Sequence, residues 1–344
     1  MAAAPRGLIG HELRLGMVAG QEGIADAVVR LRTGGVVAFP TETVYGLGAD
    51  ALNPRAVARI FELKGRPANN PLIVHVATAA ISRCVVAPGA WSHAAQRLSE
   101  AFWPGPLSIV LPKDMGVPEA VTAGGPNVAV RCPDHPMALS LLEAFGGPLV
   151  GPSANISGRV SPTTAEHVRS AFNEQDVLVL DGGPCRAGIE STVVSLVGEP
   201  RVLRPGLVSA AEIARVIQRP VSEPEYSAVP EPGGAPLESP GQLASHYAPA
   251  ARTIIAESQS VLGDARTAGG SSVIISWSGL EWPRIIRMPR DATGYAAHLY
   301  AALREADAVH PSLIVVERPP MDGDQKSRAI WMAVMDRLGR AAAQ

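Results

Sequence analysis

The sequence predicts an α/β protein of two domains joined by a proline- and glycine-rich linker. Short apolar runs alternate with segments of helical periodicity through most of the chain. A length of 344 residues suits two domains of ordinary size. A stretch rich in Pro and Gly, without apolar periodicity, separates the two alternating regions. These three observations together indicate two α/β units.

The composition excludes several other classes of protein. The chain is 47% hydrophobic and 18% charged, which is too apolar for a disordered polyelectrolyte. Its net charge of −2 gives no overall polycation for nucleic acid. Cys84, Cys132 and Cys185 show no CxxC spacing, so neither a disulfide scaffold nor a zinc site is expected. No run resembles a signal peptide or a membrane span, and we expect a cytoplasmic protein.

The first domain is expected over residues 1–217, with its core at about 20–207. Short apolar runs predict strands at 35–39, 72–76, 107–111, 128–130, 177–180, 192–196 and 201–203. Helical patterns lie between them at 23–33, 55–64, 91–101, 136–144 and 165–173. The mixture predicts one substantial sheet covered by helices.

A small C-terminal domain is expected over residues 251–344, after a linker at 218–250. Strands are predicted at 253–256, 272–276, 285–288 and 313–316. Thr293 is the expected cap of a helix that runs to about residue 308, and 325–341 reads as a terminal helix. The alternation indicates a mostly parallel, Rossmann-like layer. The linker composition is that of a plain tether, except at His246 and Tyr247.

The helix at 55–64 has clear start and stop signals and ends on two cations. Asn53 suits the N-cap, and Gly65 suits the C-terminal stop. Lys64 emerges in line with the buried stripe, and Arg66 follows at once. Cations at a helix end can simply complement the helix dipole. The chain contains only three lysines, however, and this scarcity favours a functional role for Lys64.

Polar side chains also follow the predicted strands, which is where α/β proteins usually place ligands. Thr43 lies in the glycine-containing segment after the first strand, although an ordinary surface turn would look the same. His75 lies within an apolar strand pattern, where a hydrogen-bonded core histidine is the common alternative. Arg131 ends another strand and could hold a carboxylate or phosphate with two hydrogen bonds.

The segment at 151–166 is a polar loop that leads into a helix. It contains Ser153 and Asn155, and Thr163 with Glu166 fits a capping box. Such a helix start suits an anion, although a capped helix after an ordinary loop is the alternative. The segment at 181–194 repeats this design, with Glu190, Ser191 and Thr192 entering a strand, and Arg204 ends the next strand. Cations, hydroxyls and amides without a nucleophile–base pair suit phosphates and a carboxylate.

The motifs that carry a family resemblance appear in order along the first domain. They are FPTETVYGLG at 39–48, KGR at 64–66, PLIVH at 71–75, WPGPL at 103–107, AVR at 129–131, PSAN at 152–155, ESTVV at 190–194 and LRPG at 203–206. With the linker, SHYAP at 245–249 and the α/β tail, the chain resembles the YrdC-type threonylcarbamoyl-AMP synthase family in its long, two-domain form. The resemblance covers roughly residues 20 to 340.

The resemblance implies a twisted mixed sheet with a concave, basic site. It also implies the condensation of L-threonine, bicarbonate or CO2, and ATP into threonylcarbamoyl-AMP, with release of pyrophosphate. Other proteins would pass the threonylcarbamoyl group to adenosine 37 of tRNA, and this chain would contact tRNA weakly at most. Mg2+ would arrive with ATP, without a direct protein ligand. Ser195 stands where the family often has an acid.

The resemblance also implies roles for individual residues. Lys64 and Arg66 are the expected catalytic residues. Threonine is expected at Thr43, His75, Arg131, Ser153 and Ser191. ATP is expected at Lys64, Arg66, Asn70, Asn127, Asn155, Thr163, Arg204 and Tyr247. His246 and Tyr247 are expected to cross the cleft as a lid that protects a labile product.

Two alternatives remain at this point. The cluster of cations could hold tRNA or double-stranded RNA, but the net charge and the lack of an aromatic stacking platform count against this. A carbamoyltransferase could carry a similar domain, but such proteins add zinc-finger segments that the cysteine spacing here excludes.

Overall fold

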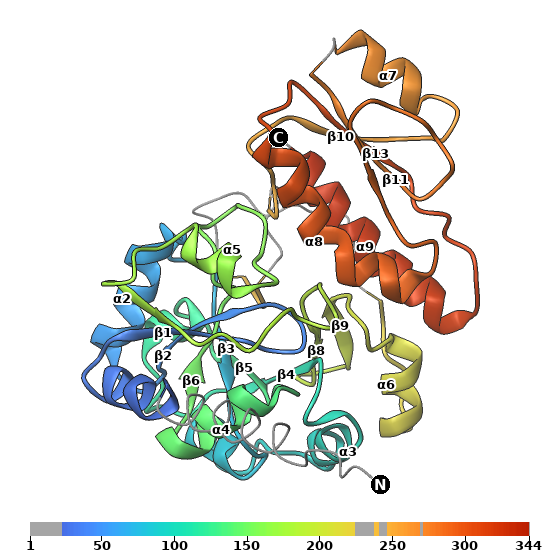
Figure 1. Ribbon diagram of the computed structural model, residues 1–344. Helices are drawn as coiled ribbons and strands as arrows, with labels where there is room; N and C mark the ends of the chain where they lie inside the picture. The colour runs from blue at the N-terminus through green and yellow to red at the C-terminus, as the bar shows by residue number, and fades with distance from the viewer. Residues whose placement is uncertain (1–22, 224–236, 241–245, 269–270, 344) are drawn as a thin grey trace, which may run out of the picture.

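The computed structural model describes residues 23–223, 237–240, 246–268 and 271–343, which form two α/β units (Figure 1). The larger unit is built around a nine-stranded mixed sheet and the smaller one around a four-stranded sheet. The chain thus has the twisted mixed sheet and the second α/β layer that the sequence predicts. None of the helices in these described ranges is long and apolar enough to cross a membrane.

The nine-stranded sheet has the order β7-β1-β2-β6-β3-β5-β4-β8-β9. Its strands are β1 (Val36–Phe39), β2 (Gly46–Asp50), β3 (Ile73–His75), β4 (Leu107–Pro112), β5 (Asn127–Arg131), β6 (Leu149–Val150), β7 (Val177–Val179), β8 (Thr192–Ser195) and β9 (Arg201–Arg204). β3 and β5 run parallel, so their carboxyl ends place His75 beside Arg131 in register. This pairing brings two predicted ligand residues to one edge of the sheet.

Helices of the larger unit cover this sheet (Figure 1). They span residues 23–32, α2 (Pro54–Lys64), α3 (His93–Phe102), α4 (Pro136–Phe145), α5 (Ala165–Arg169) and α6 (Ala210–Ile217), with short 3-10 turns at Ile81–Cys84 and Glu119–Thr122. α2 confirms the sequence prediction: Asn53 caps its start, and Gly65 ends it in the left-handed region with φ 57°. These signals are local, and the sequence shows them directly.

β2 and β6 were not predicted, because neither has an ordinary strand pattern. β2 contains Gly46 and Gly48, which read as a flexible loop in the sequence. An added Cβ on either glycine would lie about 3 Å from the ring of Phe39 on the neighbouring strand. The glycines therefore allow the two strands to pair across an aromatic ring, a reason that no local pattern reveals.

The capping box predicted at Thr163 and Glu166 is wrong by one residue. Thr164 is the N-cap of α5, and its hydroxyl accepts a hydrogen bond from the backbone N–H of His167. The Thr163 hydroxyl instead lies 3.4 Å from Nδ1 of His167. Because α5 has only five residues and ends at Arg169, its start is a weak candidate for an anion site.

The smaller sheet has the order β10-β13-β11-β12, and all its pairs are parallel. Its elements are β10 (Thr253–Ala256), α7 (Val261–Thr267), β11 (Val273–Ser276), β12 (Ile285–Arg287), α8 (Ala292–Ala308), β13 (Ile314–Glu317) and α9 (Gln325–Ala342). Asp291 caps α8, so the predicted cap at Thr293 is wrong. α8 and α9 lie between this sheet and the larger unit (Figure 1).

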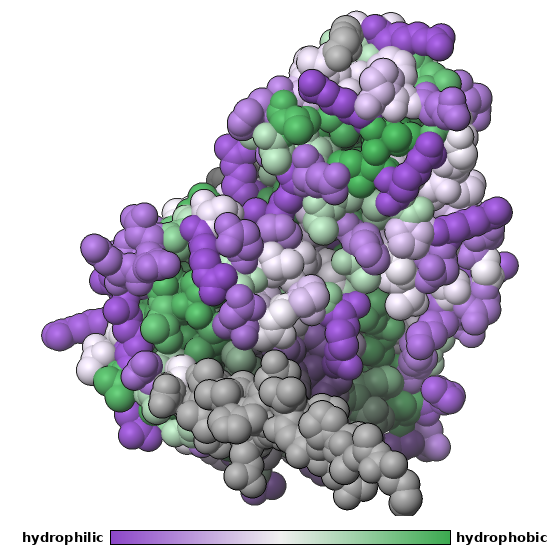
Figure 2. Space-filling view, viewed as in Figure 1, coloured by the Kyte–Doolittle hydropathy of each residue, from purple (hydrophilic) through white to green (hydrophobic). Residues whose placement is uncertain are grey.

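The two units share a hydrophobic cluster. Val44, Val160 and Ile189 of the larger unit pack in one cluster with Tyr295 and Tyr300 of α8. Figure 2 shows hydrophilic residues spread over both lobes of one face, with hydrophobic residues visible between them. The units are therefore packed against each other rather than tethered at a distance.

Candidate active site

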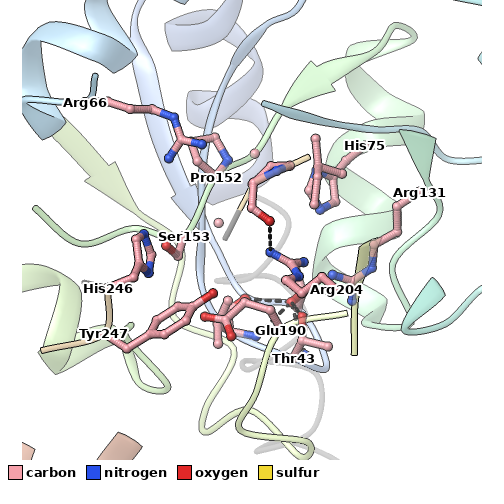
Figure 3. A pocket seen from close by; sticks show the side chains of 16 residues that line it. Thr43, Arg66, His75, Arg131, Pro152, Ser153, Glu190, Arg204, His246 and Tyr247 are labelled. Carbon is pink, nitrogen blue, oxygen red and sulfur yellow. Dashed lines mark hydrogen bonds between the residues drawn. The ribbon is translucent and has the colours of Figure 1, made fainter. Parts of the chain in front are cut away.

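A narrow cavity lies at the carboxyl ends of β3 and β5, beneath residues that precede the smaller unit (Figure 3). It is lined by Thr41, Thr43, Val44, Gly46, Arg66, Ile73, His75, Arg131, Gly151, Pro152, Ser153, Glu190, Arg204, Pro240, His246 and Tyr247. Its volume of about 40 Å3 is far below the roughly 300–1,000 Å3 typical of small-molecule sites. A substrate therefore needs part of the wall to move.

One wall carries Arg131 and His75. The Arg131 guanidinium forms an ion pair with Glu42 at 2.7 Å, and its Nε donates to the Gly105 carbonyl at 3.2 Å. Its Nη1 has no partner among the described residues, which leaves a donor for a ligand. Burial lowers the pKa of His75 to about 3, and the Arg131 cation acts in the same direction. His75 is therefore neutral at pH 7. An added Cβ on Gly151 would lie 2.5 Å from Nδ1 of His75, so only glycine permits this approach.

Arg66 enters the cavity from the second position after α2, directly behind the C-cap Gly65. Its Nε donates to the Asn70 carbonyl at 2.9 Å, and Nη2 donates to Oδ1 of Asn70 at 2.7 Å and to the Pro71 carbonyl at 2.6 Å. Asn70 thus orients the guanidinium and does not line the cavity itself. In the sheet register Asn127 lies level with Pro71, two residues before the Ile73–Ala129 pair. Asn127 begins β5, at the end of the strand opposite Arg131, and is not part of the cavity lining.

Lys64 holds the loop that carries Ser153. Its Nζ donates to the carbonyls of Ser153 at 2.6 Å and of Asn155 at 2.5 Å. Burial, followed by repulsion from Arg66, lowers the pKa of Lys64 well below its usual value. The Asn155 amide donates to the Ile156 and Arg159 carbonyls at 2.8 Å each. Lys64 and Asn155 therefore shape the cavity from behind its wall.

The opposite wall joins Arg204 at the end of β9 to Ser191 at the start of β8. Arg204 Nε donates to the Ser191 carbonyl, and Nη2 donates to the Ser191 hydroxyl, both at 3.1 Å. The Ser191 hydroxyl also lies 2.9 Å from the hydroxyl of Ser108. An added Cβ on Gly206 would lie 2.4 Å from the backbone nitrogen of Thr192, so this close approach requires glycine. Ser191 lies behind Arg204 and Glu190, which line the cavity.

His246 and Tyr247 close the cavity from the linker. Their rings are in edge contact at 4.1 Å between centroids. Tyr247 has a φ of 62°, an uncommon and strained conformation for a bulky residue. Burial raises the pKa of Tyr247 to about 12 and lowers that of His246 to about 3. The expected placement of Tyr247 over the cleft is thus found, and its movement as a lid stays a prediction.

The structure brings together part of the predicted site. Thr43, Arg66, His75, Arg131, Ser153, Arg204 and Tyr247 line the cavity. Lys64, Asn70, Asn127, Asn155, Thr163 and Ser191 lie outside its lining. Asn70, Lys64, Asn155 and Ser191 contact the residues or loops that line it. Thr163 instead accepts a hydrogen bond from the Cys185 amide, which fixes a neighbouring loop.

Three polar residues of the lining, Thr41, Glu190 and His246, are not among the predicted ligand residues. The Thr41 hydroxyl lies 2.9 Å from the Thr43 hydroxyl. Glu190 directly precedes the predicted Ser191, and His246 directly precedes the predicted Tyr247. Their places in the ESTVV and SHYAP motifs are the sequence signal that could have identified them as cavity residues. In the described ranges, no group of three His, Cys, Asp or Glu residues could hold a metal ion.

The burial of the cations weighs against the RNA alternative. Lys64, Arg66, Arg131 and Arg204 are all buried, with 9% or less of their surface exposed. RNA is recognised by exposed cations that contact its backbone and by aromatic platforms that stack its bases. These four cations are instead buried, three of them lining a closed cavity and Lys64 behind its wall.

Two family models together match most of the chain. The Sua5/YciO/YrdC model, described as telomere recombination, matches residues 29–206. The model of the threonylcarbamoyl-AMP synthase C-terminal domain matches residues 208–343. The threonylcarbamoyl-AMP synthase of Pyrococcus abyssi is 38% identical over 322 residues, which are 91% of this chain and 92% of the relative. That of Bacillus subtilis is 39% identical over 332 residues, 93% and 92% of the two chains.

Solved structures show the same likeness. The crystal structure of P. abyssi Sua5 complexed with L-threonine has a TM-score of 0.84 and 37% identity, and the match covers 93% of this chain and 94% of that one. A P. abyssi Sua5 variant with a His-Tyr pair replaced by alanines also has a TM-score of 0.84, at 36% identity over 93% and 92% of the two chains. This chain therefore belongs to the Sua5/YrdC family of threonylcarbamoyl-AMP synthases, which are enzymes.

Proposed function

We propose that this chain condenses L-threonine, bicarbonate and ATP into threonylcarbamoyl-AMP and releases pyrophosphate. This synthesis would be the first step in the threonylcarbamoyl modification of adenosine 37 of tRNA, and other proteins would carry out the transfer. The observation that carries the proposal is the likeness to threonylcarbamoyl-AMP synthases along more than nine-tenths of both chains. The cavity adds chemical support, because it gathers cations and hydroxyls without a nucleophile–base pair.

Threonine would bind at the wall formed by β3 and β5. Arg131 offers its unpaired Nη1 to the threonine carboxylate, while Glu42 and Gly105 fix the rest of the guanidinium. His75 is neutral and can accept or donate one hydrogen bond at the same wall. The solved complex of P. abyssi Sua5 with L-threonine supports an amino-acid site in this fold.

ATP would bind along Arg66 and Arg204, the two other cations that line the cavity. Lys64 lies behind Ser153, and its lowered pKa reflects burial and repulsion from Arg66. A bound triphosphate would oppose both effects and favour the charged ammonium form. Lys64 and Arg66 would then offset the negative charge that the phosphates carry.

Substrate entry would require the segment with His246 and Tyr247 to move. These two rings fill the space above the cavity, which leaves it at about 40 Å3. Strain at Tyr247, with its φ of 62°, would lower the cost of leaving this arrangement. A solved P. abyssi Sua5 variant has alanines in place of a His-Tyr pair. The sequence of this chain contains one His-Tyr dipeptide, His246-Tyr247, in the segment that would have to move.

The reaction needs positioning more than covalent help. The threonine nitrogen would attack carbon dioxide derived from bicarbonate and lose a proton, which gives a carbamate. A carbamate oxygen would then attack the α-phosphate of ATP, and pyrophosphate would leave with the electrons of the broken bond. Holding the reactants side by side and neutralising the phosphates would supply most of the rate.

Mg2+ would come with the nucleotide. Glu190 is the one carboxylate among the described lining residues, and hydrogen bonds from Ser161 and Tyr300 already engage both its oxygens. The cavity therefore suits Mg2+ held by phosphate oxygens rather than by protein carboxylates. When bound, the ion would neutralise phosphate charge.

Pyrophosphate release tests the proposed function. We expect release that depends on both threonine and bicarbonate, and a decrease of about 100-fold or more in Lys64→Ala and Arg66→Ala. Arg59→Ala is the matched control, because Arg59 is a half-exposed cation on the same helix that pairs with Asp176. Release that continues when threonine is omitted would contradict the proposal.

A further inference from the structure

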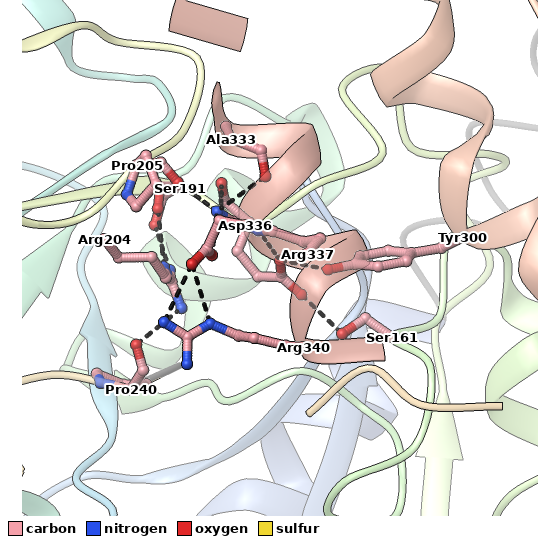
Figure 4. Close-up of polar contacts among 11 residues, drawn as sticks. Ser161, Ser191, Arg204, Pro205, Pro240, Tyr300, Ala333, Asp336, Arg337 and Arg340 are labelled. Atoms are coloured by element: carbon pink, nitrogen blue, oxygen red, sulfur yellow. Dashed lines mark hydrogen bonds and ion pairs between the residues drawn. The ribbon is translucent and has the colours of Figure 1, made fainter. Parts of the chain in front are cut away.

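We propose that Arg337 and Tyr300, both from the smaller domain, are positioning residues for the active site. They hold Glu190, and through it the two chain segments that carry Ser191 and Arg204 (Figure 4). This inference rests on the proposed function and deepens it, because it assigns the second domain a part in shaping the cavity.

The Glu190 carboxylate faces the cavity on one side and three donors on the other. Its Oε1 accepts a hydrogen bond from the Ser161 hydroxyl at 2.7 Å. Its Oε2 accepts from the Tyr300 hydroxyl of α8 at 2.8 Å and from Arg337 Nε of α9 at 3.2 Å. Two of the three donors thus come from the second domain. A buried carboxylate with this set of donors is fixed in both position and charge.

Arg337 also binds the backbone on both sides of the cavity wall. Its Nη1 donates to the Pro205 carbonyl at 2.5 Å, and Nη2 donates to the Glu190 carbonyl at 3.3 Å. Pro205 directly follows Arg204, and Glu190 directly precedes Ser191. One fully buried guanidinium therefore ties together the two segments whose side chains bind each other in the wall. A lysine has no planar fork and could not make these contacts together.

The two domains are closely packed where they meet beside the cavity. Gly188 has a φ of 71°, and an added Cβ there would lie 2.5 Å from the Ala296 carbonyl on α8. The Tyr247 ring stacks on Tyr300 at 5.5 Å with an angle of 30° between the planes. Arg337 lies 5.9 Å from the centroid of the same Tyr247 ring. The same two residues therefore contact both the wall and the segment that covers the cavity.

Electrostatics agrees with this role. Burial alone would raise the pKa of Glu190, but Arg337 first, then Arg204 and the hydroxyls of Ser161 and Tyr300, hold it below its usual value. The carboxylate therefore stays charged at neutral pH. Removal of the Tyr300 hydroxyl or the Arg337 charge would raise this pKa, so the acidic limb of the activity profile would move to higher pH.

Two tyrosines of α8 provide a matched test. Tyr300→Phe and Tyr295→Phe each remove one hydroxyl from a fully buried ring of the same helix. The Tyr295 hydroxyl has no hydrogen-bond partner among the described residues. We expect Tyr300→Phe to raise the KM for threonine about tenfold and to move the acidic limb upward. Tyr295→Phe should leave both within about twofold.

Arg337→Gln and Arg337→Lys extend the test in the full-length protein. We expect Arg337→Gln to raise the threonine KM more than Tyr300→Phe does, and Arg337→Lys to recover part of that loss because it keeps the charge. The inference is overturned if Tyr300→Phe lowers the melting temperature without moving KM or the pH limb. Equal effects of the two tyrosine variants would overturn it as well. A wild-type enzyme without threonine-dependent pyrophosphate release would instead overturn the proposed function.

Discussion

Two buried ion pairs flank the cavity, and they present opposite charges to it. Glu42 and Arg131 both belong to the larger domain, and the cation of this pair lines the cavity. Glu190 and Arg337 come from different domains, 147 residues apart, and in this pair the carboxylate lines the cavity. The difference teaches that one wall is complete within the first domain and the other depends on the second. A cation and a carboxylate facing one space match the two charges of a free amino acid.

The largest effect on stability and on threonine binding should follow from breaking the Glu42–Arg131 ion pair, which lies within the larger domain. Arg131→Gln leaves Glu42 buried without its cation, and it removes the donor proposed for the threonine carboxylate. We expect the free energy of unfolding to fall by about 3–5 kcal/mol. Threonine binding should become undetectable. Urea denaturation and titration calorimetry measure the two effects separately.

A double variant separates these two effects. Glu42→Gln combined with Arg131→Gln removes both charges, so much of the lost stability should return while threonine binding stays absent. If the double variant regained threonine affinity, Arg131 would not bind the carboxylate. Arg337→Gln offers the comparison across domains: we expect a similar loss of stability but measurable threonine binding, because Ser161 and Tyr300 still hold Glu190.

The next effect is smaller for each pH unit and comes from two buried neutral histidines, His75 in the first wall and His246 in the segment that covers the cavity. Burial lowers the pKa of both His75 and His246 to about 3. Between about pH 6.5 and pH 3 the unfolded chain binds these protons and the folded chain does not. Stability should therefore fall as the pH falls through this window, by about 1.4 kcal/mol per pH unit for each histidine.

Single variants locate this pH dependence. The two histidines contribute equally to the slope of the unfolding free energy against pH. His75→Asn and His246→Asn should therefore each remove about half of their joint contribution. His93→Asn, at an exposed position, is the control and should leave the slope unchanged. A slope that stays at its wild-type value in both cavity variants would show that these two histidines are protonated in the folded protein.

The smallest effect is expected at an exposed pair close to the first wall. Arg186 contacts Asp134 at 2.7 Å, with 67% and 50% of the two side chains exposed. Arg186→Ala should change the free energy of unfolding by less than about 0.5 kcal/mol, because water screens this pair. A loss of several kcal/mol would mean that ion-pair geometry matters here more than burial does. Thermal unfolding beside Arg131→Gln provides the direct contrast.

Local signals in the sequence predicted much of the secondary structure, and the failures have physical reasons. The helix with Asn53 at its start and Gly65 at its end was predicted well, because capping depends on adjacent residues. α6 and α7 were not predicted. β2 was mistaken for a loop because its glycines are needed for close packing against the Phe39 ring of the neighbouring strand, which the local sequence does not show. The predicted ligand residues at strand ends met at the cavity where parallel strands shared an edge, as with His75 and Arg131.

Other site residues were predicted from motifs, and they lie behind the residues that line the cavity. Lys64 and Asn155 support the loop around Ser153, and Ser191 supports Arg204. Motif spacing indicates which residues belong to a site. It does not show which side chain reaches the open space and which one holds its neighbour, since that depends on how the strands cross.

By itself the sequence determined the family, the two α/β units and the presence of cations and hydroxyls at strand ends, because ordered motifs and periodicity are properties of neighbouring residues. Only the tertiary structure decided that Glu190 faces the cavity and that Arg337 and Tyr300 hold it. These partners lie more than 100 residues away in the chain. Contacts across such distances follow from the packing of one domain against another, which local patterns do not encode.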